Sequence, residues 1–286
     1  MPNLSLFGKI ANFSAPARIG IFILTLLLSW IPLAGPIYFF GQDTNLASIL
    51  AIALLYIEFI ILVRFWGKKV YQEPHLLHRY GLVISRRNFQ GFLQGLGIGL
   101  FSLFSLFILE IFLGWVVWQS PSEKLLQFIF EGLLVSVGIG FAEELLFRGW
   151  LLDELERNYQ EKVVLWVSSI VYAGLHFIKP IGEILRTWLQ FPGLVLLGLI
   201  FVWAKRSSKK KLGKNTDYKQ ELLGFPMGIH SGLVWGYYII NVGGLVKYSD
   251  AVGELVVGVD GNPLAGLMGL LFLGAIALWM RKFVSD

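Results

Sequence analysis

Cysteine is absent from this 286-residue sequence, and charged residues make up only 15% of it. A chain without cysteine forms no disulfide, no thiolate nucleophile and no cysteine-ligated metal site. Its candidate chemistry is therefore limited to carboxylate, imidazole and hydroxyl groups. Hydrophobic residues account for 56% of the sequence, which is more than one soluble core would use. Scarce charge and abundant apolar residues together predict an integral, multi-pass membrane protein.

The excess of basic residues gives a net charge of +5, which by itself could indicate a nucleic-acid partner. The Lys and Arg residues, however, lie in the gaps between apolar runs and do not form one groove-sized patch. We therefore predict no nucleic-acid partner, and we attribute the basic segments to the way the chain crosses a lipid bilayer.

Eight apolar runs predict an all-α polytopic bundle of about eight transmembrane helices. The runs cover residues 19–40, 46–66, 89–118, 126–147, 163–178, 187–204, 224–241 and 263–280. The first run is too long for the roughly 7–15-residue core of a signal peptide, so we expect an uncleaved first span. Gly91, Gly95 and Gly99 recur at four-residue spacing in the third run and predict a face against which another helix packs closely.

Basic residues are distributed very unevenly between the two sides of this predicted bundle. The N-terminus, every second gap and the C-terminus together hold 19 Lys and Arg residues. The opposite side holds only Lys124, Lys179, Arg186 and Lys247, and Arg64 lies inside the second run. Because positive charge concentrates on the cytoplasmic side of a membrane, both termini are predicted to be cytoplasmic.

Two adjacent carboxylates, Glu143 and Glu144, close the fourth apolar run, and charge at membrane depth is costly and usually functional. On a helix, Glu144 can pair with Arg148 four residues later, while Glu143 points about 100° away. This spacing predicts one paired carboxylate and one free carboxylate that could act as a general base. The alternative is a helix end whose charges face water.

Two of the four histidines, His176 and His230, lie inside apolar runs on other predicted helices. A lone histidine on such a helix is usually a packed core residue, but imidazoles and carboxylates from separate helices can also hold an activated water or a metal ion. The sequence contains no His-Glu-x-x-His, no Gly-x-Ser-x-Gly and no aspartate pair within the runs. The chemistry that remains is a carboxylate with two histidines.

Glu143-Glu144-x-x-x-Arg148, Tyr172-x-x-x-His176 and His230, in this order, resemble the CPBP intramembrane protease family. This family includes the type II CAAX prenyl endopeptidases and the Abi group of bacteriocin-processing or immunity proteins. The resemblance implies that Glu143 and His176 activate the hydrolytic water, that His230 holds the site or the oxyanion, and that Glu144 pairs with Arg148.

The resemblance also implies an organisation in three parts. Residues 1–124 hold N-terminal transmembrane helices and a basic loop, residues 125–241 hold the CPBP/Abi-like protease core, and residues 242–286 hold a C-terminal loop and a final helix. The implied activity is hydrolysis of a peptide bond in a membrane-associated protein or peptide near the cytoplasmic face. Glu143, His176 and His230 would either ligate a zinc ion or polarise a water without a metal.

Two positions depart from the family pattern. Tyr172 stands where phenylalanine is commoner, which is a mild change. Val234 stands one turn after His230, where the family usually has Asn or Asp. Valine cannot donate a hydrogen bond to a developing oxyanion, so either Tyr172 or Tyr237 supplies this bond or the protease is weak or inactive.

Val234 favours a second hypothesis, a non-catalytic membrane scaffold that binds a peptide in the same cavity. A third hypothesis is a transporter in which Glu58 and Glu110 join a proton relay, although the sequence shows no internal repeat.

The predicted helices also leave a mismatch in depth. Glu143 and His230 lie roughly 8–9 Å inside their runs, and His176 nearly 20 Å inside its own. We therefore expect the fifth helix to begin outside the bilayer or to tilt strongly.

Overall fold

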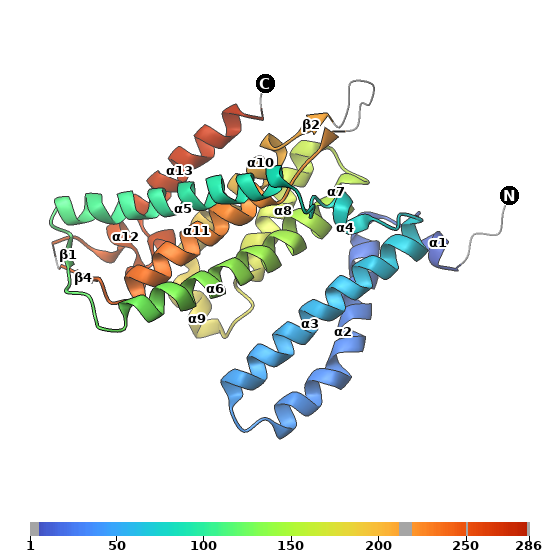
Figure 1. Cartoon of the computed structure of the whole chain (residues 1–286), viewed down its shortest axis with the longest axis horizontal. Helices are drawn as coiled ribbons and strands as arrows, with labels where there is room; N and C mark the ends of the chain where they lie inside the picture. The colour runs from blue at the N-terminus through green and yellow to red at the C-terminus, as the bar shows by residue number, and fades with distance from the viewer. Residues whose placement is uncertain (1–5, 212–218, 250, 285–286) are drawn as a thin grey trace.

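Helices account for most of the chain in the computed structural model, which describes residues 6–211, 219–249 and 251–284 (Figure 1). The α-helices are α1 Leu6–Ile10, α2 Ala15–Phe40, α3 Thr44–Trp66, α4 Leu76–Arg79, α5 Arg86–Phe112, α6 Leu125–Glu144, α7 Leu152–Glu156, α8 Glu161–Leu175, α9 Ile181–Thr187, α10 Phe191–Ser207, α11 Gly224–Asn241, α12 Glu254–Val257 and α13 Leu267–Lys282. The π-helical segments are η1 Gly67–Tyr71 and η2 Leu145–Leu151, and the 3-10 turns are η3 Trp188–Gln190, η4 Val259–Gly261 and η5 Pro263–Ala265. The chain is thus mostly helical, as predicted.

Five helical segments are long and apolar enough to cross a membrane, which confirms an integral membrane protein. They cover Ala15–Phe40, Thr44–Tyr71, Arg86–Phe112, Leu125–Glu156 and Ile181–Ser207. The other three apolar runs form α8, α11 and α13, which have 15, 18 and 16 residues. Part of the basic segment between α10 and α11, residues 212–218, lies outside the described residues.

The third apolar run is not one helix over residues 89–118. α5 ends at Phe112, and Val116–Trp118 form the strand β1, which pairs antiparallel with β4 (Val246–Tyr248). Gly114 lies between α5 and β1 with a φ of 74°, a left-handed conformation that glycine adopts readily and that ends the helix. A second small sheet pairs β2 (Lys210–Lys211) with β3 (Lys219–Gln220). Neither sheet was expected from the sequence.

The helix that carries Glu143 continues well beyond the predicted end of the fourth run. α6 runs on through η2 and α7 as one apolar segment to Glu156. Glu143 therefore lies thirteen residues before the end of this segment, and His176 lies fifteen residues after the start of α8 at Glu161. Ending the fourth helix too early therefore explains the expected mismatch between Glu143 and His176, whereas His230 lies only six residues after the start of α11 at Gly224.

α5 and α11 pack backbone against backbone along matching series of glycines. A Cβ atom on Gly95 would lie 2.3 Å from the carbonyl oxygen of Phe225, and one on Gly228 would lie 2.0 Å from that of Phe92. Any side chain at these positions would therefore push the helices apart. The packing face predicted from the α5 glycines is confirmed, and its partner is the series Gly224, Gly228 and Gly232 of α11.

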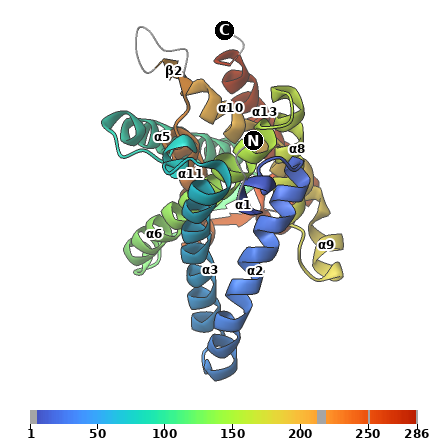
Figure 2. The ribbon, with the colours of Figure 1, turned by 90° about the vertical axis from the view of Figure 1, so that its right-hand side faces the viewer.

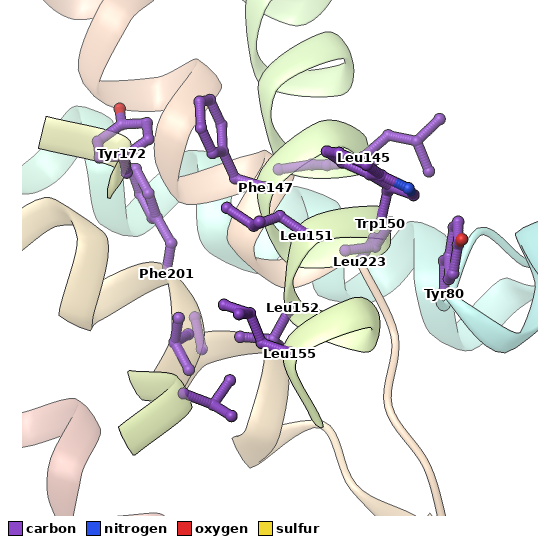
Figure 3. Packing of buried hydrophobic residues seen from close by; sticks show 14 of the residues in the cluster. Tyr80, Leu145, Phe147, Trp150, Leu151, Leu152, Leu155, Tyr172, Phe201 and Leu223 are labelled. Carbon is purple, nitrogen blue, oxygen red and sulfur yellow. The ribbon is translucent and has the colours of Figure 1, made fainter. Parts of the chain in front are cut away.

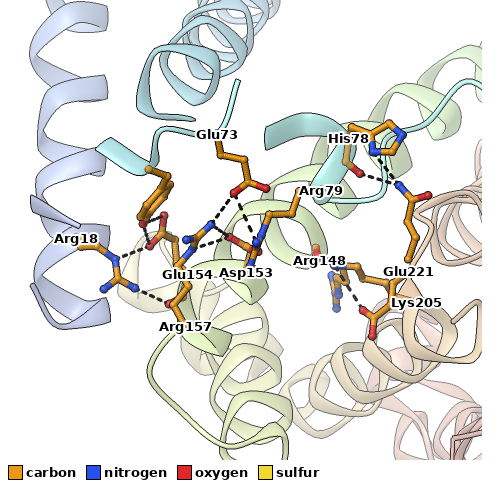
Figure 4. A network of polar contacts seen from close by, with 12 residues as sticks. Arg18, Glu73, His78, Arg79, Arg148, Asp153, Glu154, Arg157, Lys205 and Glu221 are labelled. Atoms are coloured by element: carbon orange, nitrogen blue, oxygen red, sulfur yellow. Dashed lines mark hydrogen bonds and ion pairs between the residues drawn. The ribbon is translucent and has the colours of Figure 1, made fainter. Parts of the chain in front are cut away.

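α2 and α3 form a hairpin that diverges from the rest of the bundle, as two perpendicular views show (Figures 1 and 2). The hairpin is anchored near the end where α3 passes into η1. There Arg18 Nε lies 2.9 Å from Glu154 Oε2, and the Tyr71 hydroxyl donates to the same carboxylate at 2.6 Å (Figure 4). Arg18 and Glu154 are both buried, so this pair fastens the hairpin to α7.

Candidate active site

Glu144 and Arg148 form a buried ion pair where α6 passes into η2. Arg148 Nη1 lies 3.1 Å from Glu144 Oε1, and the two side chains are 2% and 0% exposed. The guanidinium lies against the rings of Tyr172 and Phe201, 4.3 and 4.8 Å from their centroids, where cation–π attraction adds to the ion pair. Neither charge faces water, so the alternative of a solvated helix end is wrong for this pair.

The π-helical turn of η2 directs its large side chains into the same core. Phe147 meets the ring of Tyr172 edge to face at 5.0 Å, and Tyr172 meets Phe201 in the same way (Figure 3). Segments of π-helix are rare and are frequently found at functional sites. Here the segment starts directly after Glu144.

His230 is held by the buried ion pair. Its Nδ1 lies 2.9 Å from Glu144 Oε1, and its ring stacks on Phe201 at 4.8 Å. Because Glu144 is paired with Arg148, its ionised carboxylate accepts and His230 Nδ1 donates, a tautomer assigned from these contacts. His230 Nε2 then faces Glu143 Oε2 at 3.9 Å.

His176 is held in an equivalent way at the end of α8. Its Nδ1 lies 2.8 Å from the carbonyl oxygen of Tyr172, and a carbonyl can only accept, so Nδ1 carries the proton. Its Nε2 faces Glu143 Oε2 at 3.8 Å. Tyr172 thus supports the site twice, through its carbonyl on His176 and through its ring beside Arg148.

Three polar atoms from three helices therefore converge: Glu143 Oε2, His176 Nε2 and His230 Nε2. Separations of 3.8 and 3.9 Å are too long for direct hydrogen bonds. Glu143 Oε2 is buried and has no hydrogen-bond partner among the residues that the structure describes. With both imidazoles neutral, all three atoms are acceptors, so the space between them suits a donor such as water.

The same residues were also candidates for a zinc site. Within residues 6–211, 219–249 and 251–284, no group of three His, Cys, Asp or Glu side chains is arranged to hold a metal ion. Glu143, His176 and His230 therefore do not form such a group in the positions described.

A cavity of about 260 Å³ opens beside these groups and is lined mainly by apolar side chains. The Glu143 and His176 side chains are 29% and 32% exposed, so both are accessible from it, unlike Glu144. Val234 lines the same cavity, which brings the missing donor position next to the candidate chemistry. The hydroxyl of Tyr237, one of the expected substitutes, donates to the Gly261 carbonyl at 3.3 Å.

Two residues near the site were not singled out from the sequence. Asn262 lines the cavity, and its Oδ1 accepts from the Leu264 amide at 3.0 Å, while its Nδ2 has no partner among the described residues. Tyr56 of α3 donates to the Ala142 carbonyl at 2.9 Å, directly before Glu143. Both are brought in by segments distant in sequence, and no local pattern marks them.

The carboxylates of the transporter hypothesis do not join this group. Glu58 accepts a hydrogen bond from Ser29 at 2.9 Å across the α2–α3 hairpin. Glu110 is buried near the β1 end of α5, and within the described part of the chain neither of its oxygens has a hydrogen-bond partner. Neither side chain lines the cavity beside Glu143.

Glu143, His176 and His230 lie within a part of the chain that is similar to a known protein family. Residues 124–235 match the family described as type II CAAX prenyl endopeptidase Rce1-like. The uncharacterized protein YpbD of Bacillus subtilis (strain 168) is 36% identical over 75 residues, which cover 25% of this chain. The match covers 33% of YpbD, so the chain spans about a third of that relative. No solved structure matches the chain.

Proposed function

We infer, on the premise that residues 124–235 are an Rce1-like domain of the type II CAAX prenyl endopeptidase family, that this protein is an intramembrane endopeptidase. Its substrate is a membrane-associated protein or peptide that enters the cavity beside Glu143. The observation that carries the proposal is the approach of His176 Nε2 and His230 Nε2 to one unpartnered oxygen of Glu143, at 3.8 and 3.9 Å.

In the proposed reaction, a water molecule lies between these three atoms and donates hydrogen bonds to Glu143 and to one imidazole. Glu143 takes a proton as the water oxygen attacks the substrate carbonyl, and later gives that proton to the departing amine. His176 orients the water, while the Glu144–Arg148 pair holds His230 in the tautomer that leaves Nε2 free. The alternative proposal is a zinc ion on Glu143, His176 and His230, which would require these side chains to move from the positions described.

The oxyanion formed in this step needs a donor that Val234 does not supply. The Tyr237 hydroxyl donates to Gly261, whereas Tyr172 lies against Glu143 and both histidines, so Tyr172 is proposed for this role because it is beside the reacting groups. A single donor of this kind contributes several kcal/mol to the transition state in other hydrolases.

The proposed topology has eight spans, with α8, α11 and α13 added to the five long apolar segments, and with both termini cytoplasmic. It rests on the distribution of Lys and Arg between the gaps. The division into residues 1–124, 125–241 and 242–286 is part of the same proposal. Cleavage is proposed to occur at the cytoplasmic side.

The test is turnover of a membrane-tethered peptide library by purified wild type, Glu143→Gln and Glu131→Gln, with metal analysis of each sample. Glu131 lies exposed on the same helix and is the matched control. Loss of cleavage in Glu143→Gln alone is expected. Equal cleavage by all three proteins refutes the assignment of Glu143, and one zinc per chain that is lost in His176→Ala favours the zinc alternative.

Val234 supports one competing proposal, a scaffold that binds a peptide without cleaving it. In that case the wild type binds library peptides tightly and cleaves none of them. The Glu143→Gln variant binds the same peptides as tightly as the wild type.

A further inference from the structure

A second, open groove of about 860 Å³ lies between α3, α4 and α6, apart from the cavity that contains Glu143. Four of its lining side chains are basic or can become so, and none is acidic. These four are Arg64, Lys68, His75 and His78. They come from the end of α3, from η1 and from the segment around α4, so the fold gathers them from three elements.

The two permanent cations of this groove differ from their neighbours in having no carboxylate partner. Arg79 lies 2.6 Å from Asp153, and Arg157 lies 2.8 Å from the same carboxylate (Figure 4). The side chains of Arg64 and Lys68 make no ion pair or hydrogen bond with any residue in the described parts of the chain. Both side chains are exposed near the end of α3, so they are accessible to an anionic ligand.

The acidic residue nearest in sequence does not neutralise them. Glu73 lies just before the groove residue Pro74, but its Oε2 is 3.5 Å from Arg79 and 3.6 Å from Arg157 (Figure 4). The positive charge of the groove is therefore left for a ligand.

The rest of the groove wall is apolar. Leu77, Leu82, Ile84 and Phe141 line it, and Ile84 is fully exposed. Phe141 belongs to α6, on the side that faces the diverging hairpin, and it approaches Tyr56 of α3 with ring centroids 6.0 Å apart. A cationic edge at the end of α3 and an apolar wall that includes Phe141 of α6 thus lie together in one groove.

We propose that this groove binds an anionic phospholipid, with the headgroup phosphate on Arg64 and Lys68 and an acyl chain along Ile84 and Phe141. Guanidinium and ammonium groups bind phosphate oxygens strongly, and basic pockets between membrane helices recognise lipid headgroups. A free phosphate would satisfy the cations but leave the apolar wall uncovered. A phospholipid would contact both the cations and the apolar wall. It would lie against α6 at Phe141, two residues before Glu143.

The experiment measures lipid binding by the full-length protein in detergent, by native mass spectrometry and by thermal unfolding. The probes are dioleoyl phosphatidylglycerol and dioleoyl phosphatidylcholine in mixed micelles, and sodium phosphate without lipid. The proteins are wild type, Arg64→Gln/Lys68→Gln, and the control Lys69→Gln/Lys162→Gln, which removes two exposed cations outside the groove.

Phosphatidylglycerol is expected to bind the wild type saturably and to raise its unfolding temperature, whereas phosphatidylcholine is not. Two lost cations near an anionic headgroup correspond to roughly 30-fold weaker binding in Arg64→Gln/Lys68→Gln. The control is expected to stay within about threefold of wild type.

Several results would overturn the proposal. Equal phosphatidylglycerol affinity in the two double variants would place the lipid elsewhere. An equal effect of sodium phosphate would make this a free-anion site, and equal binding of phosphatidylcholine would remove the role of charge. Because Arg64 and Lys68 are exposed, the lipid-free variants should unfold at the wild-type temperature; if they do not, Arg64→Lys, which keeps the charge, must restore both stability and lipid binding.

Discussion

Replacing Arg148 with methionine should destabilise the protein strongly, because it strands a buried carboxylate. Glu144 is 0% exposed, and Arg148 is its only cationic partner among the described residues, since the neutral His230 contributes a hydrogen bond from Nδ1. Removing one member of a buried pair typically costs about 3–5 kcal/mol. Methionine fills most of the volume between the rings of Tyr172 and Phe201. The loss of stability therefore measures the removal of the positive charge and not the creation of a cavity.

A double-mutant cycle separates the charge from other effects. Glu144→Gln removes the negative charge but keeps an oxygen that accepts from His230 Nδ1. The double variant Glu144→Gln/Arg148→Met therefore contains no stranded ion, and we expect it to recover more than half of the stability lost in Arg148→Met.

The assay is thermal unfolding of the four proteins in one detergent, followed by a probe of tertiary structure. At roughly 2–4 °C per kcal/mol, Arg148→Met should unfold about 6–20 °C below wild type. If the double variant is as unstable as the two single losses added together, the stranded carboxylate is not the cause and the reasoning fails.

Three further predictions follow from the packing, the cavity and the charge distribution. Val234→Asn should raise turnover, by up to about 10²-fold when no other donor serves, because an amide stabilises charge that appears only in the transition state; a peptide-binding scaffold would instead lose roughly 1–3 kcal/mol of stability with no turnover. Gly228→Ala should lower the unfolding temperature, since its Cβ would meet a carbonyl of α5 at 2.0 Å, whereas Gly138→Ala, with open space around it, should not. Single cysteines at Lys69 and Lys247 in this cysteine-free chain should react with impermeant reagents from opposite sides of the membrane, and labelling of both from one side would exclude the eight-span topology.

The part of the site that sequence could predict depends on spacing within one helix. Glu144 and Arg148 are four residues apart, so their contact follows from helical geometry alone, and the position of Glu143 on another face follows with it. Two histidines in apolar runs were recognisable because imidazole is rare there. The convergence of their Nε2 atoms on Glu143 was not predictable, since it depends on how three separate helices pack.

The sequence-based predictions were wrong about where two helices end, because tertiary contacts decide those ends. The fourth helix continues past Arg148 because the polar residues of α7 are paired, as Glu154 with Arg18 and Asp153 with Arg79, so a fall in hydropathy did not mark its end. The third helix ends early because Val116–Trp118 pair with a strand some 130 residues away.

The glycine contact between α5 and α11 also sets the order in which the protein can be assembled. Gly95 and Gly228 are separated by about 130 residues, so at roughly 5–20 residues per second α5 leaves the ribosome some 7–26 s before its partner. During that interval α6, α8 and α10 are made, while the groove of α5 that α11 will occupy faces lipid or the insertion machinery. The centre of the bundle is therefore closed by one of the last helices to be synthesised, and a chain interrupted before α11 would expose an unfilled glycine face to quality-control proteases.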